Sequence, residues 1–212
     1  MEHEIRFYFP TKELAKILEK INSFKDLNSP GRAFERTIQY EHPCKKFSFY
    51  QKSVDGRLRL RTTKGRDNLH CKISWKRRFP ETTKSIVNVE EEIELTVLPE
   101  EIEDVNFLIE NVLHLRKIES YERYRTIFEN QDVEVAVDEY PFGVALEIEA
   151  KKATKHPEDV VVFWMQKIGL KLEDAFRLSW DDKYRELCQK QDIEQLNHVT
   201  FGAKMPEVKD EL

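Results

Sequence analysis

Short segments that alternate strictly between charged and apolar residues recur along this chain. A period of two is typical of a β-strand that has one polar face and one apolar face. Six segments show this pattern clearly, at residues 2–9, 57–61, 72–76, 89–95, 133–138 and 146–149. Weaker versions cover residues 34–40, 47–52 and 121–128. We therefore expect a protein built from many short strands.

A second pattern, with apolar residues three or four positions apart, predicts four helices. Three of them open at a proline, which suits the first helical turn because no N–H is needed there; these are Pro10, Pro99 and Pro157. The third is expected to stop at Gly169. A shorter fourth helix is expected over residues 179–190. Because the strands outnumber the helices and mostly follow one another, the pattern favours an α+β fold around an antiparallel sheet.

Composition supports one folded domain. Hydrophobic residues make up 40% of the 212 positions, and the 6 Gly and 8 Pro are too few for a low-complexity chain. No internal repeat or shift in composition divides the sequence. We expect a single domain over residues 1–190 and a loose C-terminal tail over residues 191–212.

Charge and cysteine content narrow the class of protein. With 35 Lys and Arg against 40 Asp and Glu, the net charge of −5 disfavours a general nucleic-acid binder. No apolar run approaches the roughly 20 residues of a membrane span. Charged Glu2, Glu4 and Arg6 stand where a signal peptide would be apolar. The 3 widely spaced cysteines suit a reducing compartment. We expect a soluble cytoplasmic protein without a membrane partner, and its oligomeric state stays open.

The charged residues of the predicted strands are segregated by sign. Paired glutamates occupy positions 2/4, 92/94 and 147/149, whereas positions 57/59/61, 72/76 and 123/125 are basic. Each strand alone is explained by a solvated face, but such faces usually mix the two signs. Rows of both signs favour a concave or closed sheet with a polar inner surface. Glutamate pairs suit Mg²⁺ or Mn²⁺, and basic rows suit phosphate oxygens. The pattern therefore predicts a bound, metal-complexed polyphosphate.

The order of these motifs resembles that of the CYTH superfamily, the triphosphate tunnel metalloenzymes. The opening Glu2-His3-Glu4-Ile5-Arg6 is similar to the family's E-x-E-x-K motif. Then follow, in the family's order, Leu58-Arg59-Leu60-Arg61, Lys76, Glu92-Ile93-Glu94, Arg123-Tyr124-Arg125, residues 133–138, Leu146-Glu147-Ile148-Glu149 and residues 179–187. The resemblance implies an eight-stranded antiparallel β-barrel, or tunnel, with a charged interior and flanking helices.

The resemblance also implies roles for individual side chains. The catalytic metal ligands, or the groups that organise the metal's waters, would be Glu2, Glu4, Glu147 and Glu149. The acidic side would be completed by Glu92, Glu94 and Asp138, and the phosphates would be bound by Arg59, Arg61, Lys76, Arg123 and Arg125, with Lys183 as a further candidate.

Three more basic residues are candidates for substrate binding. Arg6 stands where the family motif has lysine, and its guanidinium favours phosphate binding over proton donation. Arg57 and Lys72 extend the basic rows. Either Lys72 or Lys76 is the lysine that contacts phosphate, and its place at the end of the strand favours Lys76.

We expect a metal-dependent triphosphatase that hydrolyses a triphosphate, first of all inorganic tripolyphosphate, with Mg²⁺ or Mn²⁺. One or two cations would be bound, and one carboxylate would orient or deprotonate the attacking water. The alternatives are an RNA 5′-triphosphatase, a thiamine triphosphatase or an adenylate cyclase of the class IV type. The alternatives without turnover are a polyphosphate- or nucleotide-binding module and a structural domain with a solvated charged face.

Overall fold

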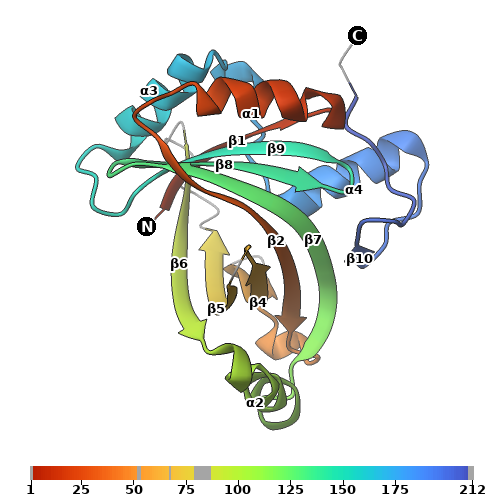
Figure 1. The fold of residues 1–212 in the computed structure, drawn as a ribbon. Helices are drawn as coiled ribbons and strands as arrows, with labels where there is room; N and C mark the ends of the chain where they lie inside the picture. Colours follow the sequence, from red (N-terminus) through yellow and green to blue (C-terminus); the bar gives the residue numbers. More distant parts are fainter. Residues whose placement is uncertain (1, 52–53, 67, 79–86, 210–212) are drawn as a thin grey trace.

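Eight strands close into an antiparallel barrel in the computed structural model, which describes residues 2–51, 54–66, 68–78 and 87–209 (Figure 1). Around the barrel the order is β7-β2-β4-β5-β6-β1-β9-β8, and pairing of β8 with β7 closes it. The strands are β1 (Glu2–Phe9), β2 (Asn28–Glu41), β4 (Val54–Lys64), β5 (Leu69–Arg78), β6 (Asn88–Val97), β7 (Arg116–Glu129), β8 (Val133–Tyr140) and β9 (Gly143–Ala150). The predicted fold class is confirmed.

Helices stand where the proline and glycine signals predict them. The first stretch forms the turn η1 (Thr11–Glu13) and α1 (Leu14–Asn22), and the second forms η3 (Pro99–Glu101), α2 (Ile102–Phe107) and the π-helical turn η4 (Leu108–Val112). The others are α3 (Pro157–Ile168) and α4 (Trp180–Gln191). Gly169 ends α3 with φ 86°, a left-handed conformation that glycine adopts without strain.

One weak strand prediction is largely wrong. Of residues 47–52, only Tyr50–Gln51 form a strand, the short β3, which pairs with β4. The preceding Lys45–Phe47 form the 3₁₀ turn η2, and residue 52 lies outside the described residues. A further 3₁₀ turn, η5, covers Leu172–Asp174.

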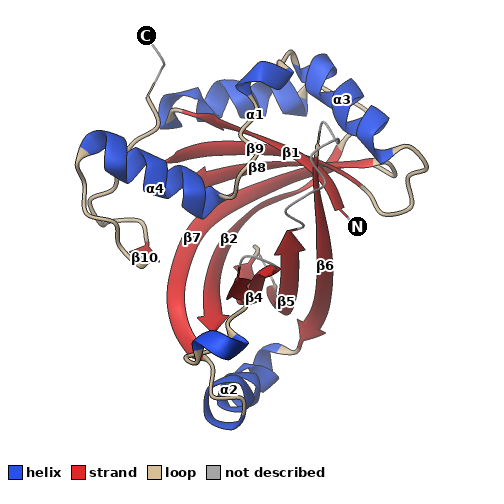
Figure 2. Cartoon of the chain, turned by 180° about the vertical axis from the view of Figure 1, so that it is seen from behind, coloured by secondary structure: helices blue, strands red, loops and turns tan. Residues whose placement is uncertain are grey.

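The apolar faces of the strands point outward, under the helices. Helices α1 and α3 cover the outer face of β1, β8 and β9 (Figures 1 and 2). There Ile5, Phe7 and Val135 are buried together with Trp164 of α3. Since side chains alternate across a strand, placing these residues outward sends their charged neighbours into the barrel. Burial of the apolar core thus determines which residues line the interior.

Two smaller clusters cover other parts of the barrel. Helix α4 brings Trp180 and Tyr184 against Tyr121 of β7 and Tyr140 of β8. At the far end of the barrel, where α2 lies (Figure 1), Ile109 of η4 packs with Tyr40 of β2 and Leu60 of β4. The contacts of α4 set its start, at Trp180, at the edge of the interior.

The segment after α4 differs from the expected loose tail. His198–Val199 form β10, which runs parallel to β7, and Val199 is fully buried. The Val208 N–H donates to the Phe142 carbonyl at 2.8 Å. Apolar burial and backbone hydrogen bonds therefore attach the described part of this segment to the barrel. Within the described ranges, no helix has the length and apolar character of a membrane span.

Candidate active site

The barrel interior holds a cavity of about 550 Å³ whose lining is dominated by charged side chains. The predicted acidic and basic rows meet there: its walls include Glu2, Glu92, Glu94, Glu147, Glu149, Arg6, Arg57, Arg59, Arg61, Lys72, Lys76, Arg123 and Arg125. Glu4 contacts Lys76 beneath this surface and is 1% exposed. Segments that are far apart in the sequence therefore share one polar interior.

Three carboxylates form a cluster at one side of the interior. Glu2 and Glu4 come from β1 and Glu149 from β9, and the register places Glu4 opposite Glu149. One oxygen of each carboxylate lies within 4.8 Å of the other two. Oxygen ligands at this spacing suit a hard divalent cation such as Mg²⁺ or Mn²⁺, so the donor set fits the predicted metal.

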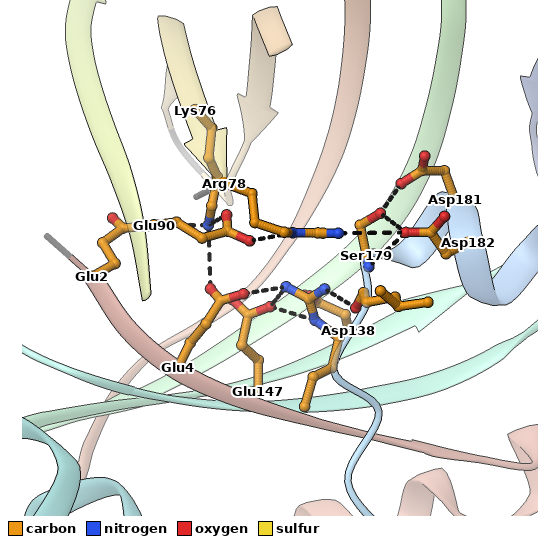
Figure 3. A network of polar contacts seen from close by, with 12 residues as sticks. Glu2, Glu4, Lys76, Arg78, Glu90, Asp138, Glu147, Ser179, Asp181 and Asp182 are labelled. Atoms are coloured by element: carbon orange, nitrogen blue, oxygen red, sulfur yellow. Dashed lines mark hydrogen bonds and ion pairs between the residues drawn. The ribbon is translucent and has the colours of Figure 1, made fainter. Parts of the chain in front are cut away.

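The ammonium of Lys76 lies among carboxylates. Its Nζ is 3.1 Å from Glu2, 3.2 Å from Glu4 and 3.3 Å from Glu90 (Figure 3). Glu90 also accepts from Arg78 Nε at 3.2 Å. The predicted phosphate-binding lysine is therefore also the counter-ion of the acidic cluster. Lys72, the other candidate, pairs with Glu94 at 2.7 Å at an exposed position.

Arginines, in contrast, hold two of the predicted metal ligands. Asp138 accepts from Arg123 at 2.8 Å and from both Nε and Nη2 of Arg125 at 2.7 Å. Glu147 accepts from Arg125 at 3.2 Å and from Arg6 Nε at 2.8 Å. Arg6 also donates to Glu4, at 3.1 Å. These contacts form a continuous ion-pair network across β1, β7, β8 and β9.

Arginines on β4 have fewer partners. Arg57 donates to Ser179 Oγ at 3.1 Å and lies 3.5 Å from Asp55, whereas Arg61 is 3.9 Å from Glu35. Arg59 is only 6% exposed, its Nε has no hydrogen-bond partner, and no ion pair joins it to another described residue. This wall of the cavity thus carries arginines that make few direct contacts with carboxylates of the described residues.

Comparison with known proteins gives structural matches alone. No family model and no curated protein sequence matches the chain. The PH1819 protein from Pyrococcus horikoshii OT3 is 21% identical, with a TM-score of 0.65 over 88% of this chain and 99% of that one. A proposed adenylate cyclase from Vibrio parahaemolyticus is 16% identical, with a TM-score of 0.62 over 85% and 95% of the two chains. HpAC1 from Hippeastrum, a proposed adenylyl cyclase described as having dominant triphosphatase activity, is 17% identical, with a TM-score of 0.58 over 88% and 96%.

The chain shares the fold of these proteins. The order of motifs in the sequence and the closure of the barrel agree on this point. Because the sequence identities are only 16% to 21%, this similarity concerns the arrangement of the backbone.

One predicted phosphate-binding residue, Lys183, lies away from the cavity lining. Lys183 of α4 pairs with Glu186 at 3.3 Å, and its Nζ lies 5.0 Å from the centre of the Phe176 ring. On a helix, residues three apart are neighbours, which explains the pairing. Its proposed phosphate contact has no support from this geometry.

Several charged residues in or beside the interior were not predicted as site residues. Glu35 accepts from Arg123 at 2.7 Å, and Glu90 belongs to the alternating set that also contains Glu92 and Glu94. Periodicity alone therefore signals Glu90, although its place in a run of three glutamates resembles a solvated turn. Asp182 accepts from the Ser179 N–H at 3.1 Å and lies 3.7 Å from Arg78 (Figure 3). In the sequence, Asp182 resembles an ordinary residue of a first helical turn.

Burial and like charge raise the pKa of the clustered carboxyls. Burial is the largest cause, and it raises the pKa of Glu2 to about 9 and that of Glu149 to about 8. Neighbouring carboxylates add to both shifts, and Lys76 opposes them. Glu147 differs: although burial raises its pKa, Arg6 and Arg125 hold it well below the usual range. The cluster thus binds protons readily without a metal, whereas Glu147 stays ionised.

These shifts predict that the metal-free protein loses stability as the pH rises. Glu2 and Glu149 take up protons in the folded state below about 9 and about 8, but in the unfolded state only below about 4.5. Their contribution is therefore present below the unfolded value and is lost as the pH rises through the folded values. Thermal unfolding in the presence of a chelator should show a lower Tm at pH 8 than at pH 6.

A conservative substitution tests whether Glu149 causes this fall in Tm with rising pH. In the Glu149→Gln variant, residue 149 cannot ionise, so the Tm should fall less between pH 6 and pH 8 than that of the wild type. Glu103→Gln, at an exposed position of α2, is the matched control and should keep the wild-type slope. Identical slopes in all three proteins would contradict the assignment.

Proposed function

We propose that this protein is a metal-dependent triphosphatase that hydrolyses inorganic tripolyphosphate inside the barrel. The observation that carries the proposal is Arg59, which forms no ion pair with another described residue and lines the same cavity as Glu2 and Glu149 of the acidic cluster. Leaving a charge buried without a partner costs several kcal/mol. A polyphosphate complexed with a divalent cation would neutralise both sides at once, with phosphate at the arginines and the cation at the carboxylates.

Glu2, Glu4 and Glu149 would hold the cation, which is Mg²⁺ or Mn²⁺. When bound, the cation would neutralise charge on the phosphate oxygens. Glu147 and Asp138, predicted as further ligands, serve in this proposal to hold Arg6, Arg123 and Arg125 in place.

The arginines would bind and orient the phosphate chain. Arg59 and Arg61 project from β4 and Arg125 from β7, so they surround the cavity from different strands. Phosphoryl transfer asks the protein mainly for positioning and for stabilisation of developing charge. Guanidinium groups whose places are set by a closed barrel supply both, because they need little rearrangement as the charge moves.

The named structural neighbours support this choice and define its main competitor. HpAC1, a proposed adenylyl cyclase, is described as having dominant triphosphatase activity, and two further neighbours are proposed adenylate cyclases. A cyclase would form cyclic AMP from ATP, whereas the proposed enzyme would release phosphate. Thiamine triphosphate and triphosphate-ended RNA complete the substrate panel.

Glu4→Gln should reduce phosphate release from tripolyphosphate at least about 100-fold, because it removes one negative charge from the cation site. The assay compares the rates with Mg²⁺ and with Mn²⁺, and chelation should abolish both. Glu103→Gln, exposed on α2, is the control of identical chemistry and should keep the wild-type rate. Equal rates for wild type and Glu4→Gln would refute the proposal, and faster turnover of ATP to cyclic AMP would favour the cyclase.

A further inference from the structure

Tyr121 is a rigid side chain on the inner face of β7. It is 2% exposed and lines the cavity, two residues before Arg123 on the same face of the strand. Its ring lies 4.2 Å from that of Trp180 and 6.0 Å from that of Tyr140, measured between centroids. Aromatic packing on two sides therefore determines where the Tyr121 hydroxyl lies.

The hydroxyl of Tyr121 has a polar neighbour across the sheet. Thr37 of β2 stands opposite Tyr121, and its side chain favours the charged form of the phenol. The Thr37 Oγ1 accepts from Arg61 Nε at 3.4 Å. Among the described residues, no carboxylate accepts a hydrogen bond from Tyr121. The phenol proton can therefore be donated to an acceptor in the cavity.

The surroundings of the hydroxyl select a negatively charged acceptor. The charged groups that act on Tyr121 most strongly are Arg59, Arg123 and Arg61. Burial alone would raise its pKa, but these arginines outweigh burial and lower the pKa to about 8. The titratable and charged groups on the surrounding elements are Glu35 on β2, Arg57, Arg59 and Arg61 on β4, Glu119 and Arg123 on β7, Asp138 and Tyr140 on β8, and Asp181 and Tyr184 on α4.

We propose that Tyr121 is a catalytic residue whose hydroxyl donates a hydrogen bond to an oxygen of the departing phosphate. The inference rests on the proposed triphosphatase function. As the phosphoanhydride bond breaks, negative charge grows on the leaving oxygen. A fixed donor beside three guanidinium groups binds that oxygen more strongly in the transition state than in the substrate, and this difference accelerates the reaction.

Tyr121→Phe keeps the ring and removes only the hydroxyl. It should lower kcat for tripolyphosphate about 100-fold and change KM less than about 3-fold, the pattern of an interaction made in the transition state. The fall of wild-type kcat/KM above about pH 8 should be absent from the variant. Tyr124→Phe, on the outer face of the same strand beside Phe34, is the matched control and should behave as wild type.

Tyrosinate absorbance gives a second readout that needs no turnover. Metal-free wild type should show one phenol titrating near pH 8 that is absent from Tyr121→Phe. Tripolyphosphate should move this titration to higher pH, because the bound anion disfavours tyrosinate. A titration that tripolyphosphate does not move would overturn the inference, as would an unimpaired Tyr121→Phe in an active enzyme. A wild type that hydrolyses no triphosphate would overturn the proposed function itself, and the catalytic role with it.

Discussion

Arg59→Met should lower kcat/KM for tripolyphosphate about 1000-fold and leave the ligand-free fold as stable as wild type or more stable. Arg59 is 6% exposed, and its guanidinium has no ion-pair partner among the described residues. The substitution removes the free-energy cost of burying a charged group, and the methionine side chain occupies a similar volume. The same substitution removes the arginine side chain that has no carboxylate partner of its own and is therefore the most available to bind phosphate. The substitution should therefore lower kcat/KM without lowering the stability of the ligand-free fold.

Two measurements check this expectation. Thermal unfolding without ligand should give a Tm at or above that of wild type, and the rise in Tm with tripolyphosphate and Mg²⁺ should disappear, since it depends on ligand affinity for the folded state. Steady-state kinetics should show the loss in kcat/KM. A large drop in ligand-free stability together with an unchanged response to tripolyphosphate would mean that Arg59 is a structural residue.

Arg123→Met, the same substitution on β7, should destabilise the fold by about 3–5 kcal/mol, because it breaks a buried ion-pair network from one side. Arg123 donates to Glu35 at 2.7 Å and to Asp138 at 2.8 Å. Although burial raises the pKa of Glu35, Arg123 and Arg61 hold it well below the usual range. Without Arg123, Glu35 and Asp138 would lose a partner in the interior.

Equilibrium unfolding in urea measures the difference, and Arg59→Met is its control because the chemistry of the change is identical. A double variant, Arg123→Met with Glu35→Gln, should recover part of the lost stability, since it removes one of the carboxylates left behind. Equal stability losses for Arg59→Met and Arg123→Met would contradict the division of the cavity into a paired side and an unpaired side.

Arg59 and Arg123 represent two different functions of the charged interior. One network joins four strands, and in it each charged side chain has a partner of opposite charge; its members are Arg123, Arg125, Asp138, Glu147 and Arg6. The arginines of β4 and the cluster of Glu2, Glu4 and Glu149 are less completely paired within the chain. We infer that the first set maintains the shape of the barrel and holds Arg125 at the cavity, and that the second set binds the ligand together with Arg125.

Local periodicity was sufficient to predict the strands and the residues on each of their faces. In the pairs Ile5/Arg6 and Leu58/Arg59, neighbouring residues point to opposite sides of a strand whatever the fold. Proline and glycine signals likewise located α1, α2 and α3, because these residues restrict or extend the backbone angles within one turn. The prediction was weakest where no period was present, at residues 47–52 and after α4.

Local sequence patterns thus predict the strands, their charged faces and a polar interior that holds both signs of charge. Which charges pair with each other depends on the three-dimensional arrangement of the strands. Arg6 and Glu147 are 141 positions apart and meet because β1 lies beside β9, whereas closure between β7 and β8 brings Asp138 to Arg123 and Arg125. Glu147 and Glu149 look alike in the sequence, yet one is held by two arginines and the other joins the carboxylate cluster. The reason is that strand register and barrel closure, which depend on contacts between distant segments, determine the few ångströms that separate a paired charge from a ligand.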